Sequence, residues 1–415
     1  MGFAPAPGTR HRAPHVALST GHQALLRYPA MPSIVILGGG VMGASVAYHL
    51  AARGARDILV IDRAGAPGGG STSRATGGFR AQYGTPINVR LSLLAREKLR
   101  RFREEIGGEC GYEPLGYLWL AMSQRELAIL DEAREMQRAE GLLEAQAVTP
   151  DEIARLNPAL TLDGIVGGAF CPTDGFIHPL GILEGYLSAA ARLGVRIEWG
   201  VEATSVVRDT AGRVTAVRTA TDTIPATVVV NAAGAWAGDF ACSCGVDTPV
   251  VPLRRQVART VRTDALPASM PMTIFAGDGF HTRVRDGRVL LLWPTPGVPG
   301  RPFDDSLDTG WISQVTAIAH QRLPVLRDVA VDPAASWAGL YEMSPDKHAI
   351  LGAAPGCDNF YLVNGSSGHG VMHAPALGHL LAEIILDGKA STLDVRALRP
   401  ERFCENDLNP ISELL

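Results

Sequence analysis

Residues 34–62 read IVILGGGVMGASVAYHLAARGARDILVID, and this stretch decides the fold of the chain. It opens with four apolar, mostly β-branched residues, which is typical of a buried parallel strand. Gly38, Gly40 and Gly43 follow in G-x-G-x-x-G register and open a helix of small residues, and a second apolar strand over residues 58–61 ends at Asp62. An acid about 20 residues beyond the glycines is the spacing of a βαβ unit that binds a dinucleotide.

Each residue type in this unit has a physical role. Gly38 permits the tight turn, Gly40 lets backbone approach a pyrophosphate, and Gly43 allows the helix to pack closely on the strand. The free N–H groups at the start of the helix hold the phosphates, while Asp62 can accept hydrogen bonds from both ribose hydroxyls. The alternatives are a glycine turn without a ligand and a membrane span. Residues 32–52 carry no charged side chain, but their glycines cluster at one turn, which argues against a span.

The composition is ordinary for a globular enzyme. The chain has 415 residues, 46% of them apolar and 19% charged, with a net charge of −4, and this length suffices for two domains. There is no basic block that would indicate nucleic-acid binding, and no second apolar run is long enough to span a bilayer. The six cysteines form no C-x-x-C pair and show no metal-ligand spacing with histidine, so a reducing cytoplasm and no metal site are expected.

Residues 1–30 differ from everything after them. They contain three arginines, three histidines and several prolines, but no acidic residue. The apolar centre of a secretory signal is missing, and the composition imitates a transit peptide. Met31 stands directly before the first strand. Residues 1–31 are therefore expected to be a poorly packed extension or the product of a start assigned too early.

A glycine- and serine-rich stretch, residues 64–78, follows the ribose acid and reads AGAPGGGSTSRATGG. Such a composition is compatible with a linker. Behind a dinucleotide-binding unit it is also typical of a loop whose backbone and hydroxyl groups, here those of residues 71–73, wrap a cofactor. The stretch continues into FRAQYG, residues 79–84, and then into residues 88–105, whose leucines form one face of an expected helix.

Two later motifs combine an apolar strand with a turn of small residues. Residues 227–237 read TVVVNAAGAWA, where small side chains let backbone pass close to a ligand; a buried strand that ends in a turn without a ligand is the alternative. Residues 339–352 read GLYEMSPDKHAILG, and residues 360–372 read FYLVNGSSGHGVM and lead into a helix that we expect to begin near Val371. Between the two motifs the chain is rich in expected strands, including a hairpin across the Asp-Gly at residues 286–287.

These stretches resemble the D-amino-acid oxidase superfamily of flavoproteins, and within it most of all the branch of sarcosine oxidase and dimethylglycine dehydrogenase. The resemblance runs from about Ser33 to about Lys389. It implies an α/β fold, α+β overall, in which a Rossmann-like FAD-binding domain is interleaved with a substrate domain built on an antiparallel sheet. The implied boundaries are residues 32–80, 150–245 and 335–390 for the FAD-binding domain, residues 81–149 and 246–334 for the substrate domain, and residues 391–415 for a C-terminal tail.

The cofactor implied by this resemblance is FAD. It is predicted to be bound non-covalently, because the cysteine that bonds FAD in monomeric sarcosine oxidase aligns with about Gly339. In this family a helix N-terminus after the S-G-H-G turn stands beside the flavin pyrimidine ring, where it stabilises the negative charge of a reduced flavin. The residues expected to bind FAD are Gly38, Gly40, Val41, Met42, Gly43, Asp62, Arg63, Ser71, Thr72, Ser73, Gly77, Gly78, Ala203, Ala232, Gly234, Trp236, Gly339, Ser367, Gly368, His369, Gly370, Val371 and Met372.

The expected reaction is oxidation of a small secondary or N-methylated amino acid to an imine by hydride transfer to flavin N5. Arg80 matches the family arginine that grips the sarcosine carboxylate, which a guanidinium suits; a surface salt bridge is the alternative. His281 is a further candidate for the pocket, and His369 either acts at the flavin or only packs at the helix start. Tyr341 stands where glycine oxidase and D-amino-acid oxidase carry their carboxylate-binding arginine, which favours the sarcosine side.

Two departures from the family pattern bear on turnover and on the electron acceptor. The lysine that pairs with the carboxylate arginine is replaced by Met372, and the lysine proposed to activate oxygen falls in residues 290–292, which are all leucine. Without that fixed positive charge, a dehydrogenase or a subunit that passes electrons to a partner is favoured over an oxidase. The alternatives are a flavin-binding assembly factor without turnover, a D-amino-acid or glycine oxidase and, less favoured, a nicotinamide-dependent dehydrogenase.

Overall fold

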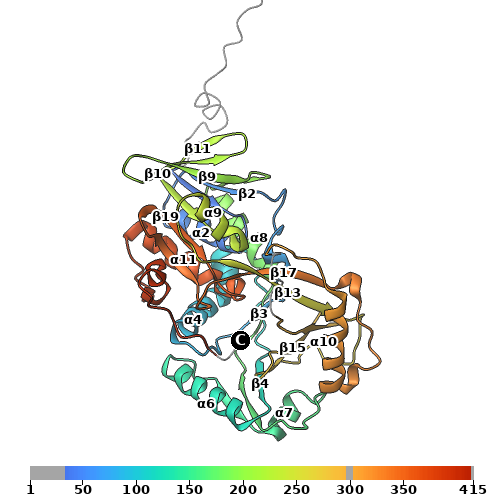
Figure 1. The fold of residues 1–415 in the computed structure, drawn as a ribbon. Coiled ribbons are helices and arrows are strands. Elements are labelled where there is room, and N and C mark those ends of the chain that lie inside the picture. Colours follow the sequence, from blue (N-terminus) through green and yellow to red (C-terminus); the bar gives the residue numbers. More distant parts are fainter. Residues whose placement is uncertain (1–32, 296–301, 413–415) are drawn as a thin grey trace, which may run out of the picture.

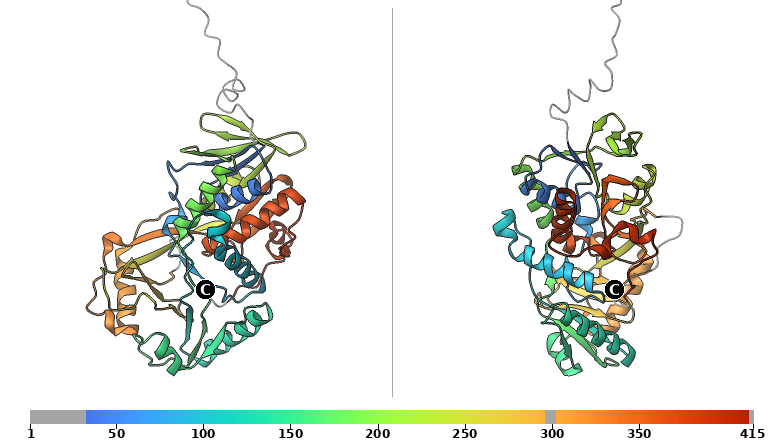
Figure 2. Two further views of the ribbon diagram at one scale, coloured as in Figure 1. Left: turned by 180° about the vertical axis from the view of Figure 1, so that it is seen from behind. Right: turned by 90° about the vertical axis from the view of Figure 1, so that its left-hand side faces the viewer.

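The computed structural model describes residues 33–295 and 302–412. The extension expected over residues 1–31 therefore lies outside the described residues. The described chain forms two large β-sheets, each with its own helices, as Figures 1 and 2 show from three sides. No helix in this part of the chain is long and apolar enough to cross a bilayer.

The first sheet has six strands in the order β18-β19-β12-β1-β2-β8, and all neighbours are parallel except β18 and β19. This confirms the predicted βαβ unit, because β1 and β2 are neighbours joined through helix α2. The strands are β1 (Ile34–Leu37), β2 (Ile58–Asp62), β8 (Arg196–Trp199), β12 (Val228–Asn231), β18 (Ile350–Ala354) and β19 (Cys357–Asn364). The helices of this half are α2 (Val41–Ala52), α3 (Ser71–Arg74), α4 (Pro86–Arg100), α5 (Phe102–Ile106), α8 (Pro179–Arg192), α9 (Ala237–Ser243) and α11 (Gly370–Asp387).

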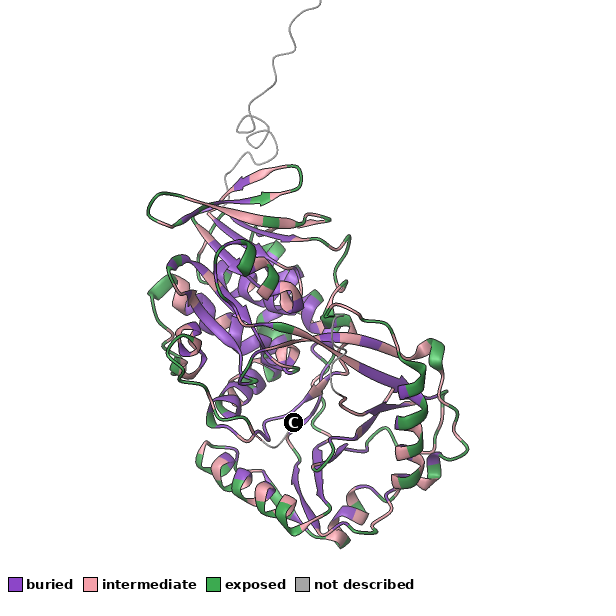
Figure 3. Ribbon diagram, in the orientation of Figure 1, coloured by how far each residue is buried: buried purple, intermediate pink, exposed green. Residues whose placement is uncertain are grey.

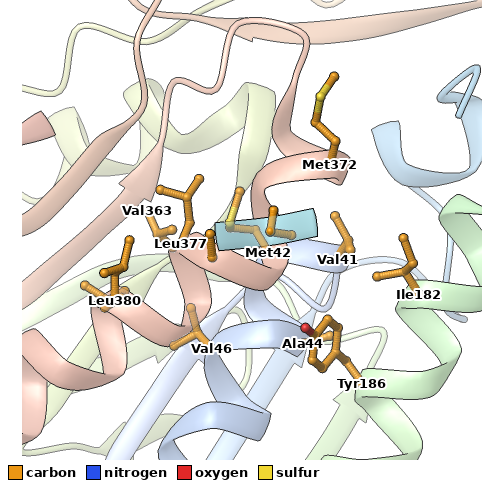
Figure 4. Packing of buried hydrophobic residues seen from close by; sticks show 14 of the residues in the cluster. Val41, Met42, Ala44, Val46, Ile182, Tyr186, Val363, Met372, Leu377 and Leu380 are labelled. Carbon is orange, nitrogen blue, oxygen red and sulfur yellow. The ribbon is translucent and has the colours of Figure 1, made fainter. Parts of the chain in front are cut away.

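Helix α2 is the central helix of this half and packs between α8 and α11. Figure 4 shows its apolar side chains, Met42 among them, close to those of α11. The small residues that the sequence places here allow a close crossing. Ser45 donates a buried hydrogen bond to the carbonyl of Ala374 (2.7 Å), and a Cβ on Gly378 would lie only 2.2 Å from Ser45 Oγ. Figure 3 shows that burial is concentrated around this helix and the first sheet.

The second sheet has eight strands in the order β17-β13-β16-β15-β14-β4-β6-β5, antiparallel except for the pair β14 and β4. The predicted hairpin is confirmed: β15 and β16 are joined by Asp286 and Gly287, whose φ angles of 55° and 65° suit a tight hairpin turn. The strands are β4 (Tyr117–Ala121), β5 (Gln146–Val148), β6 (Gly167–Cys171), β13 (Val251–Arg259), β14 (Met272–Phe275), β15 (His281–Arg285), β16 (Arg288–Leu292) and β17 (Trp337–Met343). Helices α6 (Gln124–Ala139), α7 (Pro150–Leu156) and α10 (Thr309–Arg322) pack against this sheet.

Two strands cross the domain boundaries expected from the sequence. Strand β6 falls within the expected FAD-binding range but pairs with β4, and β17 does the same with β13. Both strands, and helix α7 beside β6, therefore go with the antiparallel sheet. Between the sheets the chain forms a two-stranded ribbon of β3 (Gly78–Phe79) and β7 (Gly175–Phe176), and β3 leads directly into the FRAQYG motif.

The C-terminal segment, expected as a tail, is packed on the fold. Residues 396–403 form two short 3-10 helices, and Arg402 is completely buried. Its guanidinium donates to both carboxylate oxygens of Asp346, at 2.8 and 3.0 Å. Three further strands, β9 (Ala203–Arg208), β10 (Val214–Thr219) and β11 (Thr223–Pro225), form a separate antiparallel sheet at one end of the molecule (Figure 1).

Candidate functional site

A cavity of about 780 Å³ lies where the two sheets meet. Its walls include the carboxyl ends of β1 and β2, the first residues of α2 and α11, and parts of β13 and β17. In open parallel sheets, ligands bind in such a crevice beyond the carboxyl ends of the strands. The expected FAD-binding residues that line it are Gly38, Gly40, Val41, Met42, Asp62, Arg63, Ser71, Thr72, Gly77, Gly78, Ala203, Ala232, Gly234, Trp236, Gly339, Ser367, Gly368, His369, Gly370, Val371 and Met372.

The glycine turn fits a pyrophosphate. Gly38 has a φ of 106°, and a Cβ there would lie 2.4 Å from the carbonyl oxygen of Ala232. A Cβ on Gly40 would touch only Thr72 Oγ1, at 3.5 Å, so backbone is open to the cavity at this point. Gly43 does not line the cavity: a Cβ there would lie 1.9 Å from the carbonyl oxygen of Gly38. Its place among the ligand residues stays a prediction, and its role in close helix–strand packing is confirmed.

Asp62 ends β2 with its carboxylate fixed by backbone. Oδ2 accepts a hydrogen bond from the N–H of Gly39 and Oδ1 accepts one from the N–H of Ala64, both at 2.7 Å. Beside it, the guanidinium of Arg63 lies 3.8 Å from the ring centre of Trp236. This corner thus offers an oriented carboxylate, which suits the ribose of an adenosine.

The hydroxyl-rich segment is the short helix α3 rather than the expected loop. Thr72 Oγ1 accepts a hydrogen bond from the N–H of Val41 (3.2 Å), which ties α3 to the glycine turn. Ser71 Oγ donates to the carbonyl of Leu340 on β17 (2.7 Å). Ser73 is exposed, donates to the carbonyl of Gly70 and does not line the cavity, so its role as a ligand stays a prediction.

Arg80 lies in the cavity wall and is only 7% exposed, which excludes the alternative of a surface salt bridge. Its guanidinium carbon is 4.3 Å from the ring centre of Tyr83 and 5.1 Å from that of Trp119. The following backbone is held by Asp174, whose carboxylate accepts hydrogen bonds from the N–H groups of Ala81 and Gln82, at 2.8 and 3.2 Å. A desolvated guanidinium held between aromatic rings is suited to grip a carboxylate.

His281 and Tyr341 also line the cavity, and both are uncharged at neutral pH. Burial lowers the pKa of His281 to about 4, with the charges of Arg80 and Arg255 acting in the same direction. Burial raises the pKa of Tyr341, and the same two arginines oppose that shift. The Tyr341 ring lies against Gly368, where a Cβ would be 2.4 Å from it. The structure therefore brings together residues from β15, β17 and the turn before α11.

The turn before α11 places a helix N-terminus at the cavity. Ser367 and Gly368 have φ angles of 48° and 101°, and His369 is the N-cap of α11. The N–H of Ser367 donates to the carbonyl of Glu342 (2.9 Å), so the turn is fixed on β17. Burial holds the pKa of His369 well below its usual range. Met372, on the first turn, accepts hydrogen bonds at sulfur from the Tyr83 hydroxyl (3.4 Å) and from the backbone of the FRAQYG motif.

Several cavity residues were not predicted. Tyr83 and Tyr117 line it on the side of Arg80, and Tyr83 had a signal, because it belongs to the same FRAQYG motif. Glu342 follows Tyr341 on β17, and burial raises the pKa of its carboxyl to about 7. Arg255 on β13 and Lys347, in the turn after β17, add positive charge. Lys347 lies within the motif of residues 339–352, whereas Arg255 stands in no motif that would single it out.

Comparisons with known proteins agree with this geometry. The family described as FAD dependent oxidoreductase (DAO) matches residues 33–384. FAD-dependent oxidoreductase domain-containing protein 1 of Xenopus laevis is 27% identical over 418 residues, which cover 90% of this chain and 83% of that protein. Mitochondrial dimethylglycine dehydrogenase of Rattus norvegicus is 29% identical over 89% of this chain and 44% of its own length, so the chain spans less than half of that relative.

Solved structures share the whole fold. L-proline dehydrogenase from P. horikoshii matches with a TM-score of 0.84 at 27% identity and covers 91% of this chain and 99% of its own. Glycine oxidase from Geobacillus kaustophilus matches with a TM-score of 0.78 at 24% identity, over 89% and 98% of the two chains. These likenesses confirm the predicted α/β fold with an interleaved antiparallel sheet.

Proposed function

Because the chain belongs to the family of FAD-dependent oxidoreductases, we propose that it oxidises a small secondary or N-methylated amino acid. FAD is its cofactor. The observation that carries the proposal is Arg80, a buried guanidinium in the cavity wall beside the uncharged side chains of His281 and Tyr341. Such a site can hold a carboxylate firmly and place the rest of a small amino acid against uncharged groups.

Different parts of the cavity would hold the parts of FAD. Asp62 would accept hydrogen bonds from the ribose, and the glycine turn with the start of α2 would hold the pyrophosphate. The start of α11 would stand at the flavin pyrimidine ring, where the positive end of the helix stabilises the charge of the reduced state. Gly339 offers no side chain for a covalent bond, which supports non-covalent binding.

The chain's own residues bind and orient the substrate. FAD, when bound, would supply the acceptor for the hydride that leaves the carbon next to the amine; the nitrogen would give its proton to solvent, and water would later hydrolyse the imine. Arg80 would hold the substrate carboxylate. The Nδ1 atom of His369 is buried without a hydrogen-bond partner among the described residues and belongs to a neutral ring. It can therefore form a hydrogen bond with the substrate amine.

The inference about the electron acceptor rests on the side chains that β16 places at the cavity. This strand carries leucines at residues 290–292, of which only Leu292 lines the cavity, so β16 itself contributes no cation there. The lysine at the cavity, Lys347, comes instead from the turn after β17. We infer that reduced enzyme reacts slowly with oxygen and passes its electrons to another acceptor or partner subunit.

A second candidate function is favoured by one observation. Met372 occupies the place of the family lysine that pairs with the carboxylate arginine, and its sulfur is engaged with Tyr83 instead. A weakened substrate site on an intact flavin site would suit a flavin-binding assembly factor that does not turn over.

Anaerobic stopped-flow absorbance separates these candidates. The FAD-loaded protein is mixed with sarcosine, L-proline, N,N-dimethylglycine, glycine or D-alanine, and then with air. We expect bleaching of the flavin by a secondary or tertiary amine and slow recovery in air. Fast reoxidation with peroxide formation would identify an oxidase and contradict the inference from β16. Bleaching by none of the five would favour the assembly factor.

A further inference from the structure

Arg255 is a second guanidinium at the cavity. It lies on β13, opposite Gly339 of β17, and its side chain is partly buried. Its guanidinium carbon is 5.7 Å from the ring centre of Tyr341. Its place is therefore on the same wall as Tyr341, at the point where the first and second sheets adjoin.

No described acid balances Arg255. Within residues 33–295 and 302–412 it has no ion pair, and its acceptors are two backbone oxygens, of Arg254 and Thr295, both bound through Nη1 at 3.4 and 2.6 Å. Its Nε and Nη2 atoms have no acceptor in this part of the chain. Burial lowers the pKa of Arg255, and only the Tyr341 phenol opposes the shift. A guanidinium withdrawn from water without a counter-charge is costly, so an anion bound here would be stabilising.

Arg80 and Arg255 act on the same part of the cavity. The charges of both reach His281 and Tyr341, which are themselves neutral. One acid, Asp278, also acts on His281, but both of its carboxylate oxygens are bound by Arg322 at 2.9 Å. The cavity around His281 and Tyr341 is therefore flanked by two fixed positive charges, one more than a substrate with a single carboxylate needs.

We propose that the substrate is a secondary amine with two carboxylates, an imino- or N-alkylamino-dicarboxylic acid, held by Arg80 at one carboxylate and by Arg255 at the other. The amine then lies between them, beside His281 and Tyr341. This deepens the proposed function and rests on it, since the same carbon–nitrogen bond is oxidised. The second carboxylate makes Arg255 a residue that determines specificity.

The test uses two matched pairs of small molecules with FAD-loaded protein. Thiodiacetate and methylthioacetate carry sulfur in place of the amine nitrogen, so they have no carbon–nitrogen bond to be oxidised. The two compounds differ by one carboxylate, and their binding is followed through the flavin absorbance. Iminodiacetate and sarcosine differ in the same way and are compared by anaerobic flavin reduction. The variants are Arg255→Gln and, as a control, Arg254→Gln. Arg254 precedes Arg255 on β13 and does not line the cavity. It forms an ion pair with Asp304 and donates a hydrogen bond to the carbonyl of Ser306.

If Arg255 forms charge-assisted hydrogen bonds with the second carboxylate, each diacid should be preferred over its monoacid by about ten- to a hundred-fold. Arg255→Gln should abolish this preference and Arg254→Gln should keep it. Equal binding and reduction by diacid and monoacid in the unaltered protein, or a preference that survives in Arg255→Gln, would overturn the inference while leaving the oxidation of amines intact. Failure of every amine, including the diacid, to bleach the flavin would overturn the proposed function together with this inference.

Discussion

At the scale of single residues, Arg80 and Arg255 both line the cavity, but only Arg80 belongs to a recognisable sequence motif. FRAQYG singled out Arg80, and the structure places it at the cavity. Arg255 carried no such signal, because its place depends on β13 pairing with β17, about eighty residues further along the chain. The expected hydroxyl loop is helical, so Ser71 and Thr72 line the cavity while Ser73 does not.

Asp174 holds the backbone that directly follows Arg80. It is fully buried and accepts the N–H groups of Ala81 and Gln82, and an amide in its place offers only one acceptor oxygen. In Asp174→Asn we expect kcat/KM to fall about ten-fold, mainly through KM, and a carboxylate inhibitor to bind correspondingly less tightly.

Asp209→Asn is the matched control for that change. Asp209 also accepts two backbone N–H groups, those of Ala211 and Arg213, but it is exposed in the turn between β9 and β10. Its substitution should leave inhibitor binding unchanged. An Asp174→Asn variant that loses stability but binds the inhibitor normally would show that Asp174 supports the fold alone.

At the scale of elements, helices and strands with clear periodicity were predicted well and their ends less well. Helix α4 begins at Pro86 after Thr85, two residues before the expected start, since proline is favoured at the first helical position. The expected continuous helix over residues 88–105 is broken at Arg101 into α4 and α5. The leucine pattern could not show this break, because both helices bury their apolar side chains in one core.

Gly43 tests the close contact of α2 with β1. A Cβ there would lie 1.9 Å from the carbonyl oxygen of Gly38, and backbone atoms cannot move aside cheaply. We expect Gly43→Ala to destabilise the protein by about 3 kcal/mol or more and to reduce its FAD content. Gly65→Ala, where a Cβ meets nothing within 4 Å, is the control and should keep the unfolding temperature. Normal stability of Gly43→Ala would contradict this packing.

At the scale of the whole molecule, the local sequence predicted one βαβ unit, and the resemblance supplied the rest of the architecture. The six-stranded sheet joins segments that are far apart in the sequence: β1 pairs with β12, and β12 pairs with β19. Local periodicity holds no information on such pairings. For the same reason the expected boundaries missed that β6 and β17 join the antiparallel sheet.

Buried neutral histidines predict that the whole fold loses stability in acid. In the folded state burial lowers the pKa of His281 to about 4 and that of His373 to about 3, against an ordinary value of 6.5. Below pH 6.5 the unfolded chain therefore binds protons that the folded chain does not, and the free energy of unfolding falls as the pH drops from 6.5 towards 4. The pKa values of four more histidines are also lowered, those of His49, His348, His369 and His379.

Two buried acids act in the opposite direction over the same range. Burial raises the pKa values of Asp174 and Glu342 to about 7, so the folded state binds their protons first. The histidines outnumber them, and the net effect is destabilisation. Urea unfolding at pH 7.5 and pH 5 should show a lower midpoint at pH 5. An equal or higher midpoint would mean that the histidines are protonated in the folded protein.

Arg80 is proposed to hold the carboxylate of the amine that this flavoprotein oxidises. The most direct test of this proposal is the anaerobic rate of flavin reduction by the fastest amino acid found and by its carboxamide, in the unaltered protein and in Arg80→Gln. Loss of a bidentate charged contact is worth about 3 kcal/mol, so the unaltered protein should prefer the acid by about a hundred-fold and the variant should show no preference. Equal rates with acid and carboxamide in the unaltered protein, or the same preference in Arg80→Gln, would contradict the account.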